Sequence, residues 1–330
     1  MRICIIKLGA MGDVLRTLCV AEALKKEFEG CEIHWITKSN IAPLVKLCPF
    51  VDTVYSLPAV PSGNFDGLYC FDADEEAGAI AMKTSAGKKL GFYYQSGYPM
   101  SFNAGAEHYL NTMFDDALKK SNRKTYQEMM FEAAELHWKG ERGAIVLGRE
   151  EKEYAQQFWK EQGLEGKKVI GIHMGASPRW PSKVWHPDRL KECIMLLKGK
   201  GFEVLLFGGL DEREKLKGFW EGLKKQGIGV VCNHPDNSVR EFAALVARCS
   251  VVIGSDSFAL HVALSLGVRT VGLFFCTSPW EVEDYGLLDK MISPLLEQYF
   301  PERQDEYGEE LVKSISAEQV VSLIARMQQQ

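Results

Sequence analysis

Short apolar runs alternate with stretches of helical spacing along most of this 330-residue chain, and the alternation occurs twice. The first round predicts strands at 2–8, 33–37, 51–57 and 67–71, with helices at 13–28 and 41–47. The second round predicts strands at 168–174, 203–207, 230–231, 251–253 and 269–275, with helices at 187–198, 212–225, 239–247 and 259–266. Apolar strands separated by helices are typical of parallel sheets that are covered on both faces.

The repeated pattern predicts an α/β protein with two Rossmann-like, doubly wound parallel-sheet domains that face each other across a cleft. A length of 330 residues agrees with two domains of roughly 150 residues each. A charged amphipathic helix at 150–166 marks the junction, so we expect domains at 1–160 and 161–330. The last helix, at 316–328, begins with a capping box and carries an apolar stripe, which makes it a candidate to pack back on the N-terminal domain.

Composition excludes several classes of protein. The net charge of −5 argues against a nucleic-acid binder, and no apolar run approaches the roughly 18 residues of a membrane span. Gly9, Gly12 and Asp13 follow Arg2 too closely for a signal peptide, so we expect a cytoplasmic protein. The nine cysteines are scattered without a C-x-x-C pair, which predicts free thiols rather than disulfides or a metal site.

Ligands of open α/β sheets bind beyond the carboxyl ends of the strands, which selects four loops here. In the first loop, Gly9 and Gly12 allow a sharp turn before Asp13. Asp13 is either a helix N-cap, worth about 1 kcal/mol, or a carboxylate that points into the cleft. The G-x-G-x-x-G fingerprint of dinucleotide-binding proteins is absent from this loop.

The second and third loops offer groups for phosphate and for hydroxyls. Ser177, Arg179 and Lys183 follow the strand at 168–174 and suit a phosphate, although a plain solvated loop is the alternative. Glu212 follows two glycines at the end of the strand at 203–207. Its carboxylate either complements the helix dipole or accepts hydrogen bonds from sugar hydroxyls.

The fourth loop runs from a strand directly into a helix whose N–H groups suit a phosphate. It contains Asp256, Ser257 and Phe258, and His261 lies one turn further on, where a packed or capping histidine is the alternative. Together, the four loops predict a phosphorylated, hydroxyl-rich ligand between the domains. By themselves they predict no reaction.

The motifs also resemble those of glycosyltransferase family 9, the lipopolysaccharide heptosyltransferase family, in the right order along the whole chain. Gly9–Val14 resembles the family's G-x-x-G-D start, and Cys48–Val54 resembles its N-P-x-V-D segment. Gly175–Trp185 resembles its K-x-W loop, and Phe207–Glu212 its F-G-G loop. Asp256–His261 resembles its D-[ST]-G-x-x-H segment, and Lys89–Phe92 is a further landmark.

This resemblance implies a GT-B fold, with an acceptor-binding N-terminal domain and a nucleotide-sugar-binding C-terminal domain. It implies an inverting, metal-independent transfer in which Asp13 is the general base. Lys183, Ser177 and the backbone at Ser257–Phe258 would hold the diphosphate. By the same resemblance, Glu212 would hold the ribose and Asp256 the donor sugar, and no cofactor is needed.

The resemblance also implies the substrates. A heptose from ADP-heptose would pass to a lipopolysaccharide core or a related lipid-linked glycan. Phe258 stands where the family usually has glycine, which leaves a different nucleotide sugar open. The basic residues Lys83, Lys88–Lys89 and 119–124 either contact an anionic acceptor at the inner leaflet of the membrane or are ordinary solvated surface. A non-catalytic nucleotide-sugar binder and a dehydrogenase are the competing classes.

Overall fold

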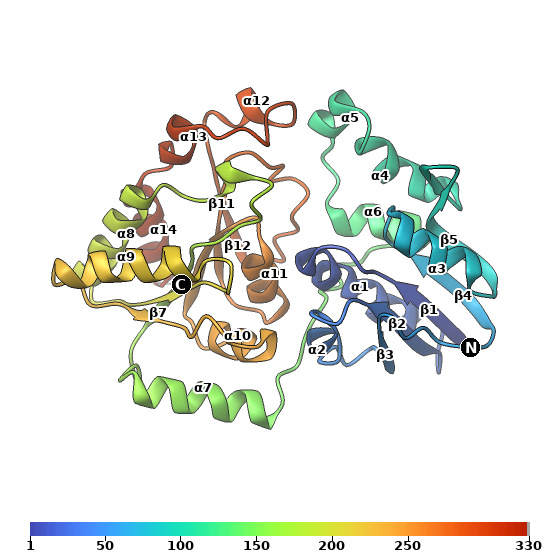
Figure 1. Ribbon diagram of the computed structural model, residues 1–330, viewed down its shortest axis with the longest axis horizontal. Helices are drawn as coiled ribbons and strands as arrows, with labels where there is room; N and C mark the ends of the chain where they lie inside the picture. Colours follow the sequence, from blue (N-terminus) through green and yellow to red (C-terminus); the bar gives the residue numbers. More distant parts are fainter. Residues whose placement is uncertain (329–330) are drawn as a thin grey trace. The chain divides into compact units, whose positions relative to one another are not determined.

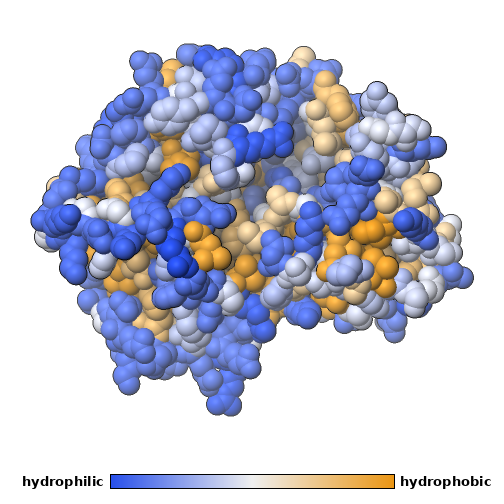
Figure 2. Space-filling model, in the orientation of Figure 1, coloured by the Kyte–Doolittle hydropathy of each residue, from blue (hydrophilic) through white to orange (hydrophobic). Residues whose placement is uncertain are grey.

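The computed structural model describes residues 1–328, whose contacts form two compact units. The N-terminal unit contains Met1–Val146 and Trp280–Glu283, and the C-terminal unit contains Leu147–Pro279 and the residues from Asp284 onward. The division therefore falls 14 residues before the predicted one. The physical reason is that helix α7 (Arg149–Glu161) packs on α10 (Val239–Val246) of the C-terminal unit. Figure 2 shows that hydrophilic residues dominate the outer surface of α7.

The N-terminal unit has a six-stranded sheet of order β3-β2-β1-β4-β5-β6. All its strands are parallel except β6, which forms an antiparallel hairpin with β5. The elements are β1 (Arg2–Ile6), α1 (Met11–Glu27), β2 (Glu32–Thr37), α2 (Ala42–Val45), β3 (Thr53–Ser56), β4 (Phe65–Cys70), α3 (Glu75–Lys83), β5 (Ala86–Gln95), β6 (Tyr98–Ser101), a 3₁₀ turn (Ala104–Ala106), α4 (Glu107–Thr112), α5 (Asp116–Ser121) and α6 (Tyr126–Ala133). The apolar strands β1 and β4 lie at its centre and are buried.

The C-terminal unit has a six-stranded, fully parallel sheet of order β12-β11-β10-β7-β8-β9. In addition to α7 and α10, its elements are β7 (Val169–His173), a 3₁₀ turn (Pro181–Lys183), α8 (Pro187–Gly199), β8 (Glu203–Phe207), α9 (Arg213–Lys225), β9 (Val231–Cys232), β10 (Val251–Ser255), α11 (Phe258–Ser265), β11 (Thr270–Phe274), β12 (Leu288–Ile292), α12 (Leu296–Tyr299), α13 (Glu309–Lys313) and α14 (Ala317–Met327).

The last helix, α14, belongs to the C-terminal unit. Its apolar residues Val320 and Ile324 are fully buried in one core with α8, α9 and the sheet. Figure 1 shows α8, α9 and α14 close together in this unit. The apolar stripe predicted for this helix therefore packs on the C-terminal unit and not on the N-terminal unit.

Each sheet has one topological switch point. In the N-terminal unit the chain leaves β1 toward β2 on one side, and β4 pairs with β1 on the other. In the C-terminal unit β8 and β10 flank β7 in the same way. The loops that follow β1 and β4, and those that follow β7 and β10, therefore diverge at the carboxyl edge, where open α/β sheets bind ligands.

Candidate active site

The turn after β1 is held by a buried aspartate from the loop after β4. Asp72 Oδ2 accepts hydrogen bonds from the backbone N–H groups of Leu8 and Gly9, the second at 2.9 Å. A Cβ atom on Gly9 would lie 2.9 Å from Asp72 Oδ1, closer than side-chain packing allows. Glycine at this position therefore lets the carboxylate approach the backbone.

A second buried charge completes this switch point. Lys7 Nζ lies 2.5 Å from Asp72 Oδ1 and donates to the carbonyl oxygen of Phe71 at 2.9 Å. Burial opposes the charged form of Lys7, but the combined attraction of Asp72, Tyr126, Asp13 and Tyr109 outweighs it, so the pKa of Lys7 is well above its ordinary value. Neither residue belongs to a motif that the sequence pattern singled out, although both follow the carboxyl end of a central strand within two residues.

Asp13 lies in the first turn of α1 and does not cap the helix. The N-cap is Ala10, which forms no side-chain capping bond, and Gly12 is buried in the helix. The N-cap interpretation of Asp13 is therefore wrong. Its carboxylate is partly exposed and lies 2.8 Å from a guanidinium nitrogen of Arg16.

An aromatic residue packs against this ion pair. The Arg16 guanidinium lies 3.8 Å from the ring centroid of Tyr126, and Tyr126 Oη lies 2.9 Å from Thr17 Oγ1. A Thr125–Glu128 capping box fixes the start of α6 and hence Tyr126. Burial raises the pKa of the Tyr126 hydroxyl, which keeps it neutral. Nothing in the sequence pattern pointed to Tyr126, because it comes from a helix about 110 residues away.

In the C-terminal unit, Lys183 and Asp256 form an ion pair across the switch point between β7 and β10. Lys183 Nζ lies 3.0 Å from Asp256 Oδ2 and 2.8 Å from its carbonyl oxygen. Ser255 Oγ donates to the carbonyl oxygen of Lys183, which ties the two loops together. The buried His261 places Nε2 3.4 Å from Asp256 Oδ1. The structure thus brings together three residues that the sequence proposed separately.

The start of α11 presents backbone N–H groups without a side-chain cap. Its N-cap, Ser257, forms no capping bond, and within residues 1–328 its buried Oγ has no hydrogen-bond partner. Phe258 turns its ring onto Phe242 of α10, with centroids 5.6 Å apart and planes at 25°. Its half-buried side chain therefore belongs to an aromatic cluster that also contains Phe207.

Glu212 folds back over two glycines. Its Oε2 accepts the N–H of Gly209 at 2.9 Å, and a Cβ atom on Gly175 would come within 2.5 Å of Glu212 Cδ. The carboxylate therefore links the loops after β7 and β8. Ser177, from the same loop as Gly175, is exposed, with Oγ 3.4 Å from the N–H of Arg179.

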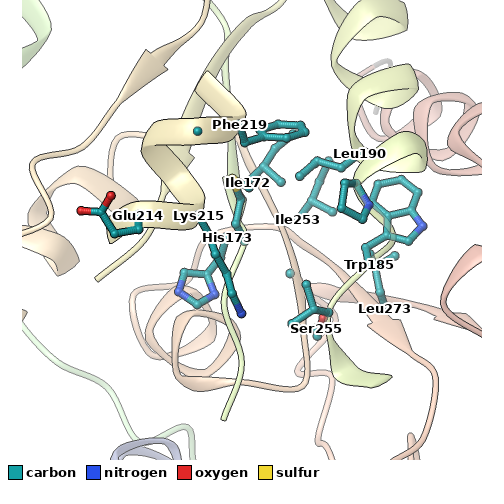
Figure 3. A pocket seen from close by; sticks show the side chains of 15 residues that line it. Ile172, His173, Trp185, Leu190, Glu214, Lys215, Phe219, Ile253, Ser255 and Leu273 are labelled. Carbon is teal, nitrogen blue, oxygen red and sulfur yellow. The ribbon is translucent and has the colours of Figure 1, made fainter. Parts of the chain in front are cut away.

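An apolar cavity of about 370 Å³ lies between the sheet and helices α8 and α9. Figure 3 shows Trp185, Leu190 and Phe219 around it, with Ser255 at one side. Val184 and Trp185 follow Lys183, and Gly254 and Ser255 precede Asp256, so the cavity walls adjoin the ion pair in sequence. Trp185 Nε1 donates to the carbonyl oxygen of Ile315, which satisfies its one donor.

Three further findings concern metal ligands, cysteines and membrane spans. Among residues 1–328, no three His, Cys, Asp or Glu side chains are placed to hold a metal ion. All nine cysteines are free; eight are buried and Cys232 is partly buried. No helix in the described part of the chain combines the length and hydropathy needed to cross a bilayer.

Comparison with known proteins decides the family. The sequence profile of glycosyltransferase family 9 (heptosyltransferase) matches residues 63–313. The chain belongs to this family. Lipopolysaccharide heptosyltransferase 1 of Campylobacter coli is 22% identical over 301 residues, which cover 84% of each chain. This family 9 chain is therefore a glycosyltransferase.

Solved structures of family 9 proteins share its fold. Glycosyl transferase family 9 from Veillonella parvula superimposes with a TM-score of 0.78 at 19% identity, covering 99% of this chain and 96% of that one. E. coli heptosyltransferase WaaC with ADP gives a TM-score of 0.65 at 17% identity, covering 100% and 98%. The two parallel-sheet units of this family 9 glycosyltransferase are thus those of the GT-B fold, as predicted.

Proposed function

We propose that this glycosyltransferase moves a heptose from ADP-heptose onto a lipopolysaccharide core or a related lipid-linked glycan. The Lys183 ammonium carries the proposal, because it lies beside the start of α11, whose backbone N–H groups have no side-chain cap. Such a site attracts a diphosphate. Relatives named lipopolysaccharide heptosyltransferases and the structure of WaaC with ADP support the choice of donor and acceptor.

In the proposed reaction, Asp13 takes the proton from the attacking hydroxyl of the acceptor. The hydroxyl oxygen forms a bond to the anomeric carbon as the bond from that carbon to the diphosphate oxygen breaks. The sugar is transferred with inversion, and ADP leaves with the electron pair. A positioned base of this kind contributes typically 10²- to 10⁴-fold. The partial exposure of Asp13 beside Arg16 supports this role, since a proton acceptor must reach its substrate.

We propose that the donor is held without a metal ion. Lys183, Ser177 and the backbone N–H groups at Ser257–Phe258 hold the diphosphate and stabilise the charge that develops on it. Asp256 accepts hydrogen bonds from sugar hydroxyls while it keeps Lys183 in place. Glu212 accepts hydrogen bonds from the ribose hydroxyls. Its carboxylate already accepts the N–H of Gly209 in the loop after β8, which supports this role.

The Phe258 ring favours a second candidate donor. The ring stands at the start of α11, at the position where the family usually has glycine, and it stacks on Phe242. We infer that it leaves less room for the donor sugar than a glycine would. A nucleotide sugar that lacks the longer carbon chain of a heptose is therefore the alternative substrate of the same transfer. The competing hypothesis is a protein that binds the nucleotide sugar without transferring it. Detection of sugar transfer in an activity assay would exclude that hypothesis.

A thermal-shift panel with ADP, UDP, GDP, CMP and NAD tests the donor. A ligand at a hundredfold excess over its Kd stabilises the folded state by about 2.7 kcal/mol. We expect ADP alone to raise Tm, and ADP-heptose then to support turnover on a lipopolysaccharide-core acceptor. Selective stabilisation by another nucleotide assigns the second candidate. We expect Asp13→Asn to lower turnover 10²- to 10⁴-fold and to keep ADP binding. Undiminished turnover excludes Asp13 as the base.

We propose that the acceptor surface contacts the inner leaflet of the cytoplasmic membrane. Lys119 and Lys120 lie in the last turn of α5, Arg123 lies over the exposed Trp280, and Met113 and Phe114 are 50% and 68% exposed nearby in the chain. Cations beside exposed apolar side chains suit an anionic bilayer surface. Of the other basic residues, Lys88 pairs with Glu135 and Lys124 with Glu132.

Vesicle binding tests this surface. We expect charge reversal at Lys119, Lys120 and Arg123 to weaken binding to phosphatidylglycerol vesicles at least tenfold. Turnover on a lipid-linked acceptor falls with it, and turnover on a water-soluble acceptor fragment does not. Lys160→Glu, in the last turn of α7, is the control. Unchanged vesicle binding in the triple variant assigns these residues to ordinary solvated surface.

A further inference from the structure

The buried Lys7–Asp72 pair at the N-terminal switch point has no role in the reaction described above. The two side chains are 3% and 7% exposed, and their charged atoms lie 2.5 Å apart. Removing two charges from water carries a large desolvation cost, and apolar replacements are often equally stable. Strands β1 and β4 already pair from Ile3 to Ile6, so the fold has little need of the ion pair.

The contacts of Asp72 show what the pair fixes. Its second oxygen accepts the N–H groups of Leu8 and Gly9, the last residues before the N-cap of α1. Because Ala10 forms no side-chain capping bond, the position at which α1 begins is set from outside the helix, by Asp72. Asp13 lies in the first turn of that helix.

A second path joins Lys7 to Asp13 through Tyr126. Lys7 Nζ lies 5.8 Å from the Tyr126 ring centroid, and the Arg16 guanidinium lies 3.8 Å from the same centroid. Arg16 in turn contacts the Asp13 carboxylate at 2.8 Å. The ion pair thus contacts both the backbone that precedes Asp13 and the cation–π stack that orients its side chain.

We propose that Asp72, charge-balanced by Lys7, is a positioning residue that fixes the Leu8–Gly9 turn and thereby holds Asp13 in its reactive position. This inference rests on the proposed role of Asp13 as the base. Asp72 does not touch the reacting atoms. Its effect is carried by two backbone hydrogen bonds and by the lysine that packs under Tyr126.

The test uses Asp72→Asn and the doubly neutral variant Lys7→Met/Asp72→Asn. The single variant strands a buried lysine and is expected to lose stability, whereas the double variant removes both charges and keeps the fold. In the folded double variant we expect kcat to fall at least tenfold. Donor KM and the Kd for ADP stay within twofold of wild type, because the proposed donor groups lie in the C-terminal unit.

Hydrogen exchange at Leu8 and Gly9 gives a readout that does not depend on activity. We expect both amides to exchange at least tenfold faster in the double variant, with Tm near that of wild type. Asp74→Asn is the matched control, since Asp74 lies two residues away and caps α3 through Ala77 N–H without contacting the turn. It is expected to leave the exchange of Leu8 and Gly9 and kcat unchanged.

Combination with Asp13→Asn separates this inference from the function on which it rests. If Asp72 acts through Asp13, adding the double substitution to Asp13→Asn lowers the residual turnover by no more than twofold. A further tenfold loss, or wild-type kcat in the folded double variant, overturns the positioning role. Full turnover in Asp13→Asn instead overturns the proposed base, while the exchange data still report whether Asp72 fixes the turn.

Discussion

Lys183 Nζ lies 3.0 Å from Asp256 Oδ2, and the two residues come from loops that diverge on either side of the switch point between β7 and β10. The N-terminal unit repeats this relationship, because Lys7 and Asp72 follow β1 and β4 at the other switch point. The buried N-terminal pair is shut off from solvent, whereas the C-terminal pair is 13% and 17% exposed. Only the second is therefore accessible to a ligand.

The first prediction concerns Lys183. Lys183→Met keeps the length of the side chain and removes its charge, so the diphosphate loses a preorganised cation. We expect kcat/KM to fall about 10²- to 10³-fold and ADP binding to weaken, as measured by steady-state kinetics and calorimetry. Lys217→Met, at an exposed position of α9, serves as control and should match wild type. Wild-type ADP affinity in Lys183→Met would remove this residue from the donor site.

The second prediction concerns the Phe258 ring. Its centroid lies 5.6 Å from that of Phe242, so the stacked rings should jointly stabilise the folded state. We expect a double-mutant cycle with Phe258→Ala and Phe242→Ala to give a coupling of about 1 kcal/mol in urea unfolding. Additive effects would mean that the rings do not interact in solution and that Phe258 is available to a donor.

Much of this architecture follows from sequence pattern, and the missing parts have physical causes. Strands buried on both faces, such as β1, β7 and β10, carry continuous apolar runs and were predicted. Strands β5 and β12 were not, because each mixes charged and apolar residues with only part of its length buried. Ligands bind beyond the carboxyl ends of parallel strands, and this rule selected the loops after β1, β7, β8 and β10. The rule succeeds because the position of a loop depends on the local order of strands and helices along the chain.

Contacts within the site were less predictable than its loops. Lys183, Asp256 and His261 were found one by one as members of loops, and their mutual distances come from strand order in the sheet. Asp72 and Tyr126 carry no motif of their own, and their roles arise only when distant segments pack together. The short G-x-x-G-D pattern could not distinguish a capping Asp13 from one in the first helical turn, because the two differ by only a few residues in where α1 begins.

The third prediction is a pH dependence that arises at His173. Burial lowers the pKa of its imidazole, whose Nδ1 is buried without a partner among residues 1–328. As the pH falls below about 6.5, the unfolded chain binds a proton that the folded ring does not, so the folded state loses stability. We expect the free energy of unfolding to fall from pH 7 to pH 5, and to fall less steeply in His173→Gln.

Urea unfolding at pH 7, 6 and 5 measures this dependence. His234→Gln, at a side chain that is 69% exposed, is the control. Equal slopes for wild type and His173→Gln would show that the buried ring does not contribute to acid sensitivity.

The fourth prediction concerns Gly9, where a methyl group would meet Asp72. A Cβ atom there would lie 2.9 Å from Asp72 Oδ1, and that carboxylate is held by Lys7 and by two backbone N–H groups, so it cannot yield without breaking them. We expect Gly9→Ala to destabilise the fold by about 1–3 kcal/mol and to lower kcat along with it. Gly222→Ala provides the contrast, since nothing lies within 4 Å of its added methyl group in α9, and there alanine should be neutral or stabilise by about 0.5–1 kcal/mol. A Gly9→Ala protein as stable and as active as wild type would mean that the carboxylate is not fixed against the turn, and the close approach would then have no part in placing Asp13.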